Sequence, residues 1–309
     1  MNTAAIIGAG LIGRAWAIVF ARAGWNVGLY DSVPEVRDQV NAEIAANLSE
    51  LAGYGLAGDD ANATAGRIRV VASIANAIDG ATFVQECGPE TVEAKLALFA
   101  ELDRLAAPGV ILASSSSAIV ASRFTENLKG RDRCLVAHPV NPPHLVPIVE
   151  LAPSPWTSAD TIERSRAIYE AIGQVPVLVR KEAEGFILNR LQGALLAEAF
   201  RLVGEGYVSP RDLDKTIKDG LGLRWSFMGP FETIELNAPG GVADYCARYL
   251  GFYRRLQDDP PTSAYSEANL ARVLTQWDAA AAKDLPAYSR RRDRKLAALR
   301  MHKTKTADH

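Results

Sequence analysis

The sequence predicts an α/β protein, with a doubly wound parallel sheet in its N-terminal part and an all-helical domain after it. Short apolar runs alternate with helical segments through residues 1–182, which is typical of a parallel sheet with crossover helices. Residues 183–309 contain helical patterns and no convincing strand. The chain of 309 residues is long enough for two domains, and we expect them at 1–182 and 183–309.

The first element is a glycine-rich turn between an apolar strand, residues 4–7, and a helix that ends at Gly24. The turn reads Gly8-Ala9-Gly10-Leu11-Ile12-Gly13, which is the Gly-x-Gly-x-x-Gly pattern. Gly8 permits a tight turn, Gly10 lets a pyrophosphate approach the backbone, and Gly13 lets the helix pack against the sheet. The N–H groups and the dipole at the helix start favour phosphate charge. This context predicts a Rossmann-like dinucleotide site.

A second strand, residues 25–30, ends on Asp31. A carboxylate at this position can accept hydrogen bonds from both ribose hydroxyls, and it would repel a 2′-phosphate. Ser32 and Val33 follow instead of an arginine. The sequence therefore predicts NAD as the cofactor rather than NADP.

The remaining elements are expected in chain order. Residues 53–66 are expected to form a turn between helices, and residues 220–230 a loop. Ser209-Pro210-Arg211-Asp212 marks a helix start, because serine caps and proline fits the first helical position. Strands are expected at 68–71, 81–86, 110–113, 133–137, 148–151 and 175–179, and helices at 34–52, 74–78, 89–105, 158–172, 186–203, 231–256, 264–283 and 287–300.

Composition excludes several classes of partner. A formal net charge of −2 and a pI near 6.1 argue against nucleic acid. No stretch approaches the ~20 apolar residues of a membrane helix, and no basic region precedes the first apolar run as it would in a signal peptide. Cys87, Cys134 and Cys246 are isolated, so we expect no metal site and a cytoplasmic protein.

One histidine stands out as a candidate for proton transfer. His138 follows a strand whose C-terminal end should lie on the ligand side of the sheet, and Glu150 ends the next extended run. Two adjacent strand ends could bring the carboxylate to one imidazole nitrogen, which would fix the tautomer and leave the other nitrogen as a base. The alternative is that His138 only caps a turn.

Three longer stretches resemble one known family. They are Val-Ala-His-Pro-Val-Asn-Pro-Pro at 136–143, Gly-Phe-Ile-Leu-Asn-Arg-Leu-Gln at 185–192, and Gly-Leu-Gly-Leu-Arg at 220–224 leading to Met-Gly-Pro at 228–230. To about residue 256 the chain resembles the 3-hydroxyacyl-CoA dehydrogenase family, and within it the branch of lambda-crystallin and L-gulonate 3-dehydrogenase. The resemblance implies a Rossmann-like domain, a helical dimerisation domain and a homodimer.

The resemblance also implies site residues. His138 matches the general base of the family, Glu150 the acid that orients it, and Asn189 the amide that contacts substrate near the reacting oxygen. Ser117 matches the catalytic serine, with Ser116 as the alternative because four serines are consecutive.

Further matches have ordinary structural alternatives. Glu90 and Lys95 match positions near the nicotinamide, but they could form a solvated ion pair. Asn141 could touch substrate or fix its loop, and Asn189 could form only an interhelical hydrogen bond. Arg224 has no obvious counterpart in the acyl-CoA enzymes, and a guanidinium can bind a carboxylate through two hydrogen bonds. We expect it to anchor a free carboxylate, the alternative being a salt bridge between domains.

The sequence departs from the acyl-CoA members of the family where CoA phosphates lie. Residues 49–65 contain Glu50, Asp59 and Asp60 and no lysine or arginine. The implied activity is therefore NAD-dependent oxidation of the C3 hydroxyl of a small free 3-hydroxy acid such as L-gulonate. The alternatives are a 3-hydroxyacyl-CoA substrate, an L-carnitine-type substrate, or an NAD-binding structural protein without activity.

The C-terminal helix has a basic face. Arg290, Arg291, Arg292, Arg294 and Lys295 all lie within it. We expect a solvated helix packed on the dimer or the other domain, with binding of anions or a membrane surface as the alternative.

Overall fold

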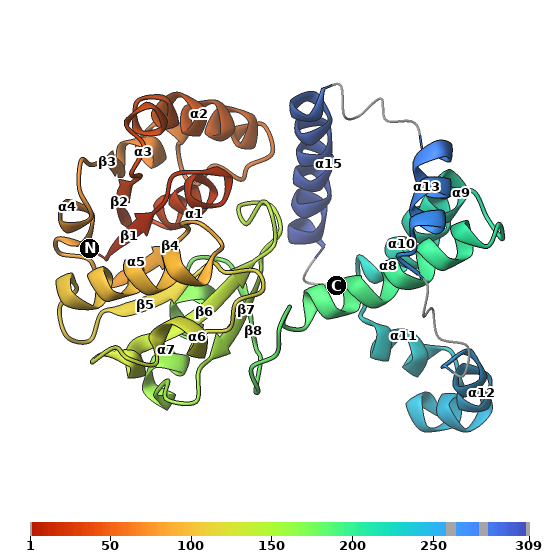
Figure 1. The fold of residues 1–309 in the computed structure, drawn as a ribbon. Coiled ribbons are helices and arrows are strands. Elements are labelled where there is room, and N and C mark those ends of the chain that lie inside the picture. The colour runs from red at the N-terminus through yellow and green to blue at the C-terminus, as the bar shows by residue number, and fades with distance from the viewer. Residues whose placement is uncertain (1, 258–263, 278–283, 307–309) are drawn as a thin grey trace. The chain divides into compact units, whose positions relative to one another are not determined.

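The computed structural model describes residues 2–257, 264–277 and 284–306 (Figure 1). The chain packs as two compact units, one formed by Met1–Asn189 with Pro286–His309 and the other by Arg190–Leu285. The C-terminal segment therefore packs with the N-terminal unit, although it follows the helical part in sequence. The boundary that the sequence predicts between two domains, after residue 182, stays a prediction.

In the described residues of the first unit the strands form one sheet in the order β3-β2-β1-β4-β5-β6-β7-β8. Figure 1 shows these strands side by side, from red at β1 to green at β8. The strands are β1 (Thr3–Ile7), β2 (Asn26–Tyr30), β3 (Ile68–Val70), β4 (Phe83–Glu86), β5 (Ile111–Ser114), β6 (Cys134–Pro139), β7 (Ile148–Pro153) and β8 (Val175–Leu178).

The sheet is mostly parallel, which confirms the predicted fold class, and it contains one antiparallel pair that the sequence does not predict. β7 runs antiparallel to β6, and β8 is parallel to β7. The physical reason is the connection between them. Residues 140–147 contain no helix, whereas a parallel crossover needs a dozen or more residues and usually a helix.

Helices cover both faces of the sheet. Alternate residues of β1 point to opposite faces, so that Ala4 and Ile6 join one apolar core while Ala5 and Ile7 join the other. Trp16 and Phe20 of α1 contribute to the first core. The helices of this unit are α1 (Leu11–Arg22), α2 (Pro34–Ala52), α3 (Ala61–Gly66), α4 (Ile74–Ile78), α5 (Val92–Leu105), α6 (Ser122–Thr125), the 3₁₀ turn η1 (Arg131–Arg133), α7 (Ala159–Ala171) and α15 (Leu285–Lys305).

The second unit is helical throughout its described residues. It contains most of α8 (Leu188–Gly204), then α9 (Pro210–Lys215), the π-helical turn η2 (Thr216–Leu221), α10 (Gly222–Trp225), α11 (Pro230–Leu236), α12 (Gly241–Gln257) and α13 (Glu267–Gln276). Across the described residues of both units, no helix is long and apolar enough to span a lipid bilayer.

Two expectations for this unit are wrong. The loop expected at 220–230 is largely helical, because η2 and α10 continue through its glycines; Gly222 lies so close to the Ile217 carbonyl that a Cβ would be 2.9 Å from its oxygen. The single helix expected at 231–256 is two helices. Pro239 cannot continue the first, and Gly241 has a φ of +67°. Of the helix expected at 264–283, α13 covers Glu267–Gln276, and residues 278–283 lie outside the described residues.

Candidate active site

The candidate site lies at one edge of the sheet. β1, β4, β5 and β6 are adjacent and parallel, so their C-terminal ends share this edge. The glycine turn follows β1, Cys87 and Gly88 follow β4, the serines follow β5, and His138 lies near the end of β6. Segments distant in sequence are thereby gathered where ligands bind in open α/β sheets.

The glycine turn has room for a ligand only at its middle glycine. Gly8 has a φ of +104°, and a Cβ there would lie 2.5 Å from the Cys87 carbonyl oxygen. A Cβ on Gly13 would lie 1.7 Å from the Gly8 carbonyl oxygen, so this glycine is required by the turn itself as well as by the sheet. A Cβ on Gly10 would meet nothing within 4 Å. The open space at Gly10 is what close approach of a pyrophosphate requires.

Asp31 joins this turn to the end of β2. Its Oδ2 accepts from the Ala9 amide at 2.7 Å and its Oδ1 from the Val33 amide at 2.9 Å. Each oxygen keeps acceptor capacity for a ribose hydroxyl. Asp31, Gly8 and Gly10 line a cavity of about 640 Å³, and Leu11 at the start of α1 is exposed, followed by half-buried Ile12. Both the volume and the lining fit a dinucleotide site.

His138 and Glu150 form a buried pair. Their Nδ1 and Oε2 atoms are 2.8 Å apart, and the residues are 5% and 3% exposed. They are register partners in the antiparallel β6–β7 ladder. The expected proximity is therefore present, but its expected cause is wrong: the residues face each other across a hairpin and do not come from two neighbouring strand ends.

Glu150 is held at both carboxylate oxygens. Its Oε1 accepts from the backbone amides of Ile187 and Leu188 at 2.8 and 2.9 Å, at the start of α8. Burial raises the pKa of Glu150, but the hydrogen bonds from His138 and the two amides outweigh it and hold this pKa below its usual value. The carboxylate is thus ionised near neutrality, His138 donates from Nδ1, and Nε2 is the nitrogen left to exchange a proton.

The serine loop after β5 distinguishes Ser117 from Ser116. Ser116 is buried, and its hydroxyl donates to Glu90 Oε1 at 2.6 Å. The Ser117 amide donates to the same oxygen at 2.8 Å, while Ser117 itself is exposed and its carbonyl accepts from Asn189 Nδ2 at 2.9 Å. Burial raises the pKa of Glu90, and the hydrogen bonds from this loop lower it to a value below the usual one. This geometry favours Ser117 as the serine available to a ligand.

Lys95 is turned into the protein. It is 1% exposed, and its Nζ lies 2.8 Å from both carboxylate oxygens of Glu86, against 3.9 Å from Glu90 Oε2. Ser114 Oγ donates to the same Glu86 carboxylate at 2.6 Å. The lysine therefore supports the ends of β4 and β5 through Glu86.

Sequence reasoning missed Glu86 and Ser114. The available signal was the position of Lys95, which shares the buried face of α5 with Phe99 and Leu102 and therefore needed an acidic partner in the interior.

Two expected substrate residues are not brought to this pair by any contact in the described residues. Asn141 is exposed in the loop between β6 and β7, and no hydrogen bond of its side chain occurs in the described part. Arg224 is exposed in α10 of the second unit. The described residues also contain no group of three or more histidine, cysteine or acidic side chains able to hold a metal.

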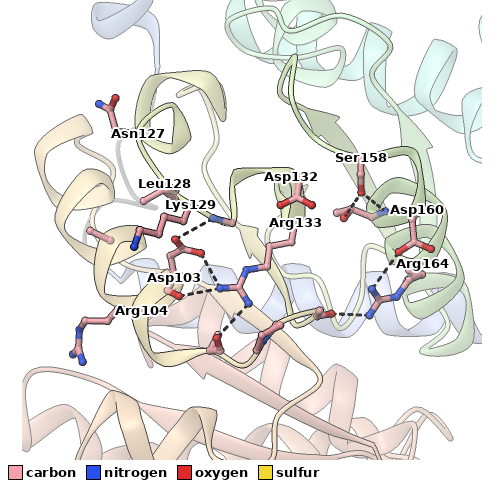
Figure 2. A pocket seen from close by; sticks show the side chains of 16 residues that line it. Asp103, Arg104, Asn127, Leu128, Lys129, Asp132, Arg133, Ser158, Asp160 and Arg164 are labelled. Atoms are coloured by element: carbon pink, nitrogen blue, oxygen red, sulfur yellow. Dashed lines mark hydrogen bonds and ion pairs between the residues drawn. The ribbon is translucent and has the colours of Figure 1, made fainter.

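A larger cavity, of about 910 Å³, lies at the opposite edge of the sheet, before β5 and β6 (Figure 2). Figure 2 shows Arg133 and Asp103 turned toward each other there. The Arg133 guanidinium donates to Asp103 Oδ1 at 2.8 Å and to the Asp103 and Ala107 carbonyls at 2.9 and 2.5 Å. Arg133 thus ties the ends of α5, β5 and β6 together.

Known protein families match both parts of the chain. Residues 3–183 match the NAD-binding domain of 3-hydroxyacyl-CoA dehydrogenase, and residues 185–284 match its C-terminal domain. The chain belongs to the 3-hydroxyacyl-CoA dehydrogenase family. It is accordingly an NAD-binding dehydrogenase, and the resemblance noted in the sequence is confirmed. The glycine turn, Asp31, His138 and Glu150 all lie in the first matched segment.

Individual members of this family are similar over most of the chain. A lambda-crystallin homolog from Bos taurus is 47% identical over 273 residues, which cover 87% of this chain and 84% of the relative. An L-carnitine dehydrogenase from Pseudomonas aeruginosa is 35% identical over 275 residues, covering 89% and 85%. The crystal structure of 5-formyl-3-hydroxy-2-methylpyridine 4-carboxylic acid 5-dehydrogenase, described as an NAD⁺-dependent dismutase, matches with a TM-score of 0.84 and 27% identity over 97% of each chain.

Proposed function

We propose that the protein catalyses NAD-dependent oxidation of the C3 hydroxyl of a small free 3-hydroxy acid, with L-gulonate as the representative substrate. The observation that supports this best is the buried His138–Glu150 pair at the sheet edge that also holds the glycine turn. A protein that only bound NAD would have no use for an ionised carboxylate buried against a histidine, since burying charge costs free energy.

His138 acts as the general base. Its Nε2 accepts the proton of the C3 hydroxyl, and the resulting imidazolium is stabilised by the Glu150 carboxylate at Nδ1. NAD, when bound, supplies the hydride acceptor. General-base catalysis typically contributes ~10²–10⁴-fold to the rate.

Ser117 and Asn189 position the reacting oxygen. Asn189 uses one Nδ2 hydrogen on the Ser117 carbonyl, so its second N–H and its Oδ1 are available to substrate. The exposed Ser117 hydroxyl is the second group that can bind the C3 oxygen.

The substrate class depends on charge. The acidic stretch 49–65 disfavours the phosphates of CoA, and we assign Arg224 the substrate carboxylate. One structural observation favours the second candidate, a 3-hydroxyacyl-CoA. Arg294 of α15 lies 3.5 Å from Glu50 Oε1, so the C-terminal helix brings positive charge to the end of α2 that the local sequence lacks.

The test is NADH formation with L-gulonate, L-carnitine, 3-hydroxybutyrate and 3-hydroxybutyryl-CoA compared side by side. Turnover of a free acid without the thioester supports the proposal, and preference for the thioester replaces it with the second candidate. If none of the four compounds is oxidised although the protein still binds NADH, the proposed substrate class is excluded.

Arg224→Met tests the carboxylate anchor. Loss of a bidentate charged contact should raise KM for the free acid by about 10–100-fold while NADH binding stays the same. Arg254→Met, which removes an exposed arginine from α12, is the matched control. An unchanged KM in the Arg224 variant excludes it from the substrate site.

We also propose a homodimer formed through the helical unit, which the exposed apolar side chains of that unit support. The cytoplasm is the proposed location.

A further inference from the structure

The loop that joins β6 to β7 is held at its midpoint by two arginines. His144 lies midway in sequence between His138 and Glu150. Its backbone carbonyl accepts from Arg22 Nη1 at 2.8 Å and from Arg300 Nη1 at 2.9 Å. Arg22 is the last residue of α1, the helix that starts at the glycine turn, and Arg300 lies in α15.

Arg300 also contacts the turn before β8, the strand on the other side of β7 from β6. Its Nη2 donates to the Gly173 carbonyl at 3.2 Å, in the turn before β8. β8 then pairs with β7 so that Val177 is the register partner of Glu150. One guanidinium therefore bridges the segment before β7 and the segment before β8.

The surroundings of Arg22 and Arg300 disfavour the charged form of both guanidinium groups. Burial, with the nearby charge of Arg300, lowers the pKa of Arg22 to about 9, and burial also lowers the pKa of Arg300. Within the described residues neither guanidinium forms an ion pair with a carboxylate; both donate to carbonyl groups. Two half-buried like charges on one carbonyl repel each other and oppose folding, so a role beyond stability is expected.

Apolar packing fixes α15 at the same place. Ala297, about one turn before Arg300, is 2% exposed and belongs to the same core as Leu145, which follows His144. The helix is thus anchored beside the loop by both its apolar and its charged side chains.

We propose that Arg22 and Arg300 form an arginine clamp on the His144 carbonyl that positions the His138–Glu150 pair relative to the glycine turn. The clamp connects three elements: the helix that starts the cofactor site, the hairpin that carries the pair, and a C-terminal helix that lies outside both matched family segments. The kinetic consequence rests on the proposed function of the pair, whereas the structural consequence does not.

The test compares Arg300→Met with Arg300→Lys in the full-length protein. The matched control is Arg291→Met, which removes an equal charge from an exposed site nine residues away on the same helix. Hydrogen exchange is followed at the Leu145 and Val146 amides, which donate to the Pro142 carbonyl within the loop. The second readout is the downfield NMR signal of the His138 Nδ1 proton, identified by its absence in His138→Ala.

In Arg300→Met we expect the two loop amides to exchange about tenfold faster or more, and the His138 signal to broaden, while amides of β1 stay unchanged. Arg300→Lys keeps the positive charge but cannot donate to the His144 and Gly173 carbonyls in the same way. Its loop exchange and its His138 signal should therefore lie between those of Arg300→Met and the wild type. With a substrate that the enzyme oxidises, kcat should fall about tenfold while KM for NAD changes little.

Loop exchange and a His138 signal identical to the wild type in Arg300→Met would overturn the clamp, as would lower thermal stability with an unchanged kcat for the folded enzyme. If Arg300→Met does not fold, the same two readouts on Arg300→Lys decide, and wild-type behaviour there overturns it equally. Absence of any dehydrogenase activity would remove the proposed function, and the exchange and NMR results would still decide the clamp.

Discussion

His138 and Glu150 belong to the part of the site that residue types and spacing make visible. A histidine after a strand and an acid in the next extended run predict the pair from the sequence alone. The amides of Ile187 and Leu188 that fix Glu150 could not be predicted, because backbone donors have no sequence signature. Buried Lys95 indicates that an acidic partner exists, but that this partner is Glu86, and that Ser114 joins it, depends on packing and on the sheet register.

Substitution of His138 tests its proposed role as the general base. His138→Ala should lower kcat by ~10²–10⁴-fold, because the hydroxyl proton loses its acceptor, and should leave the Kd for NADH nearly unchanged. Steady-state kinetics and NADH fluorescence titration measure the two effects separately. Full activity in this variant is incompatible with His138 as the base.

Glu150 predicts a pH dependence of stability. Its folded-state pKa lies below the unfolded value of about 4.3, so its stabilisation is complete above that pH and disappears as pH falls through the folded pKa. The difference in Tm between wild type and Glu150→Gln should therefore be largest near neutrality and shrink in acid. Glu126→Gln, at an exposed position, serves as the control. A Tm difference that does not vary with pH would contradict this assignment.

At the scale of elements, two substitutions in the glycine turn distinguish an effect on folding stability from an effect on NADH binding. Gly13→Ala places a Cβ against the Gly8 carbonyl and should distort the turn, lowering both Tm and NADH affinity. Gly10→Ala meets nothing in the protein, so its Tm should equal that of the wild type while NADH affinity falls at least about tenfold. Thermal melts and NADH titration of the two variants provide the comparison. Normal NADH binding by Gly10→Ala would mean that the pyrophosphate lies elsewhere.

Elements with a strong local pattern were predictable, and those decided by long-range pairing were not. The β1 strand, the glycine turn and α1 follow from apolar runs and glycine spacing. The antiparallel direction of β7 does not, since an apolar run contains no information on the direction of its partner. The helical state of residues 220–225 was missed because its two glycines favour a loop by propensity, and the surrounding helices outweigh that preference.

At the scale of the whole molecule, the helical unit lacks an interior of its own. The buried apolar residues in its described part are Val203, Pro210, Ala238 and Ala264. Large apolar side chains are instead exposed, with Phe231 at 76% and Leu236 at 72%. A unit with so little core needs a partner surface, and we propose that a second copy of the chain provides the matching apolar area.

We therefore expect the purified protein to be a dimer by size exclusion with light scattering. The double variant Phe231→Glu with Leu236→Glu should shift the mass toward the monomer, because buried carboxylates oppose association. Leu96→Glu, on the exposed side of α5 in the first unit, should leave the dimer intact. A monomeric wild type, or an equal response to both changes, would exclude this interface.

The hairpin of β6 and β7 has a consequence for how the family diversifies. The two side chains to which we assign proton transfer lie in one continuous segment, Cys134–Pro153, so a lineage inherits them together. The helical unit, Arg190–Leu285, is a separate stretch of the gene and can accumulate changes without separating base from acid. Under the proposed function, changes in the helical unit can alter substrate preference and leave the acid–base pair intact.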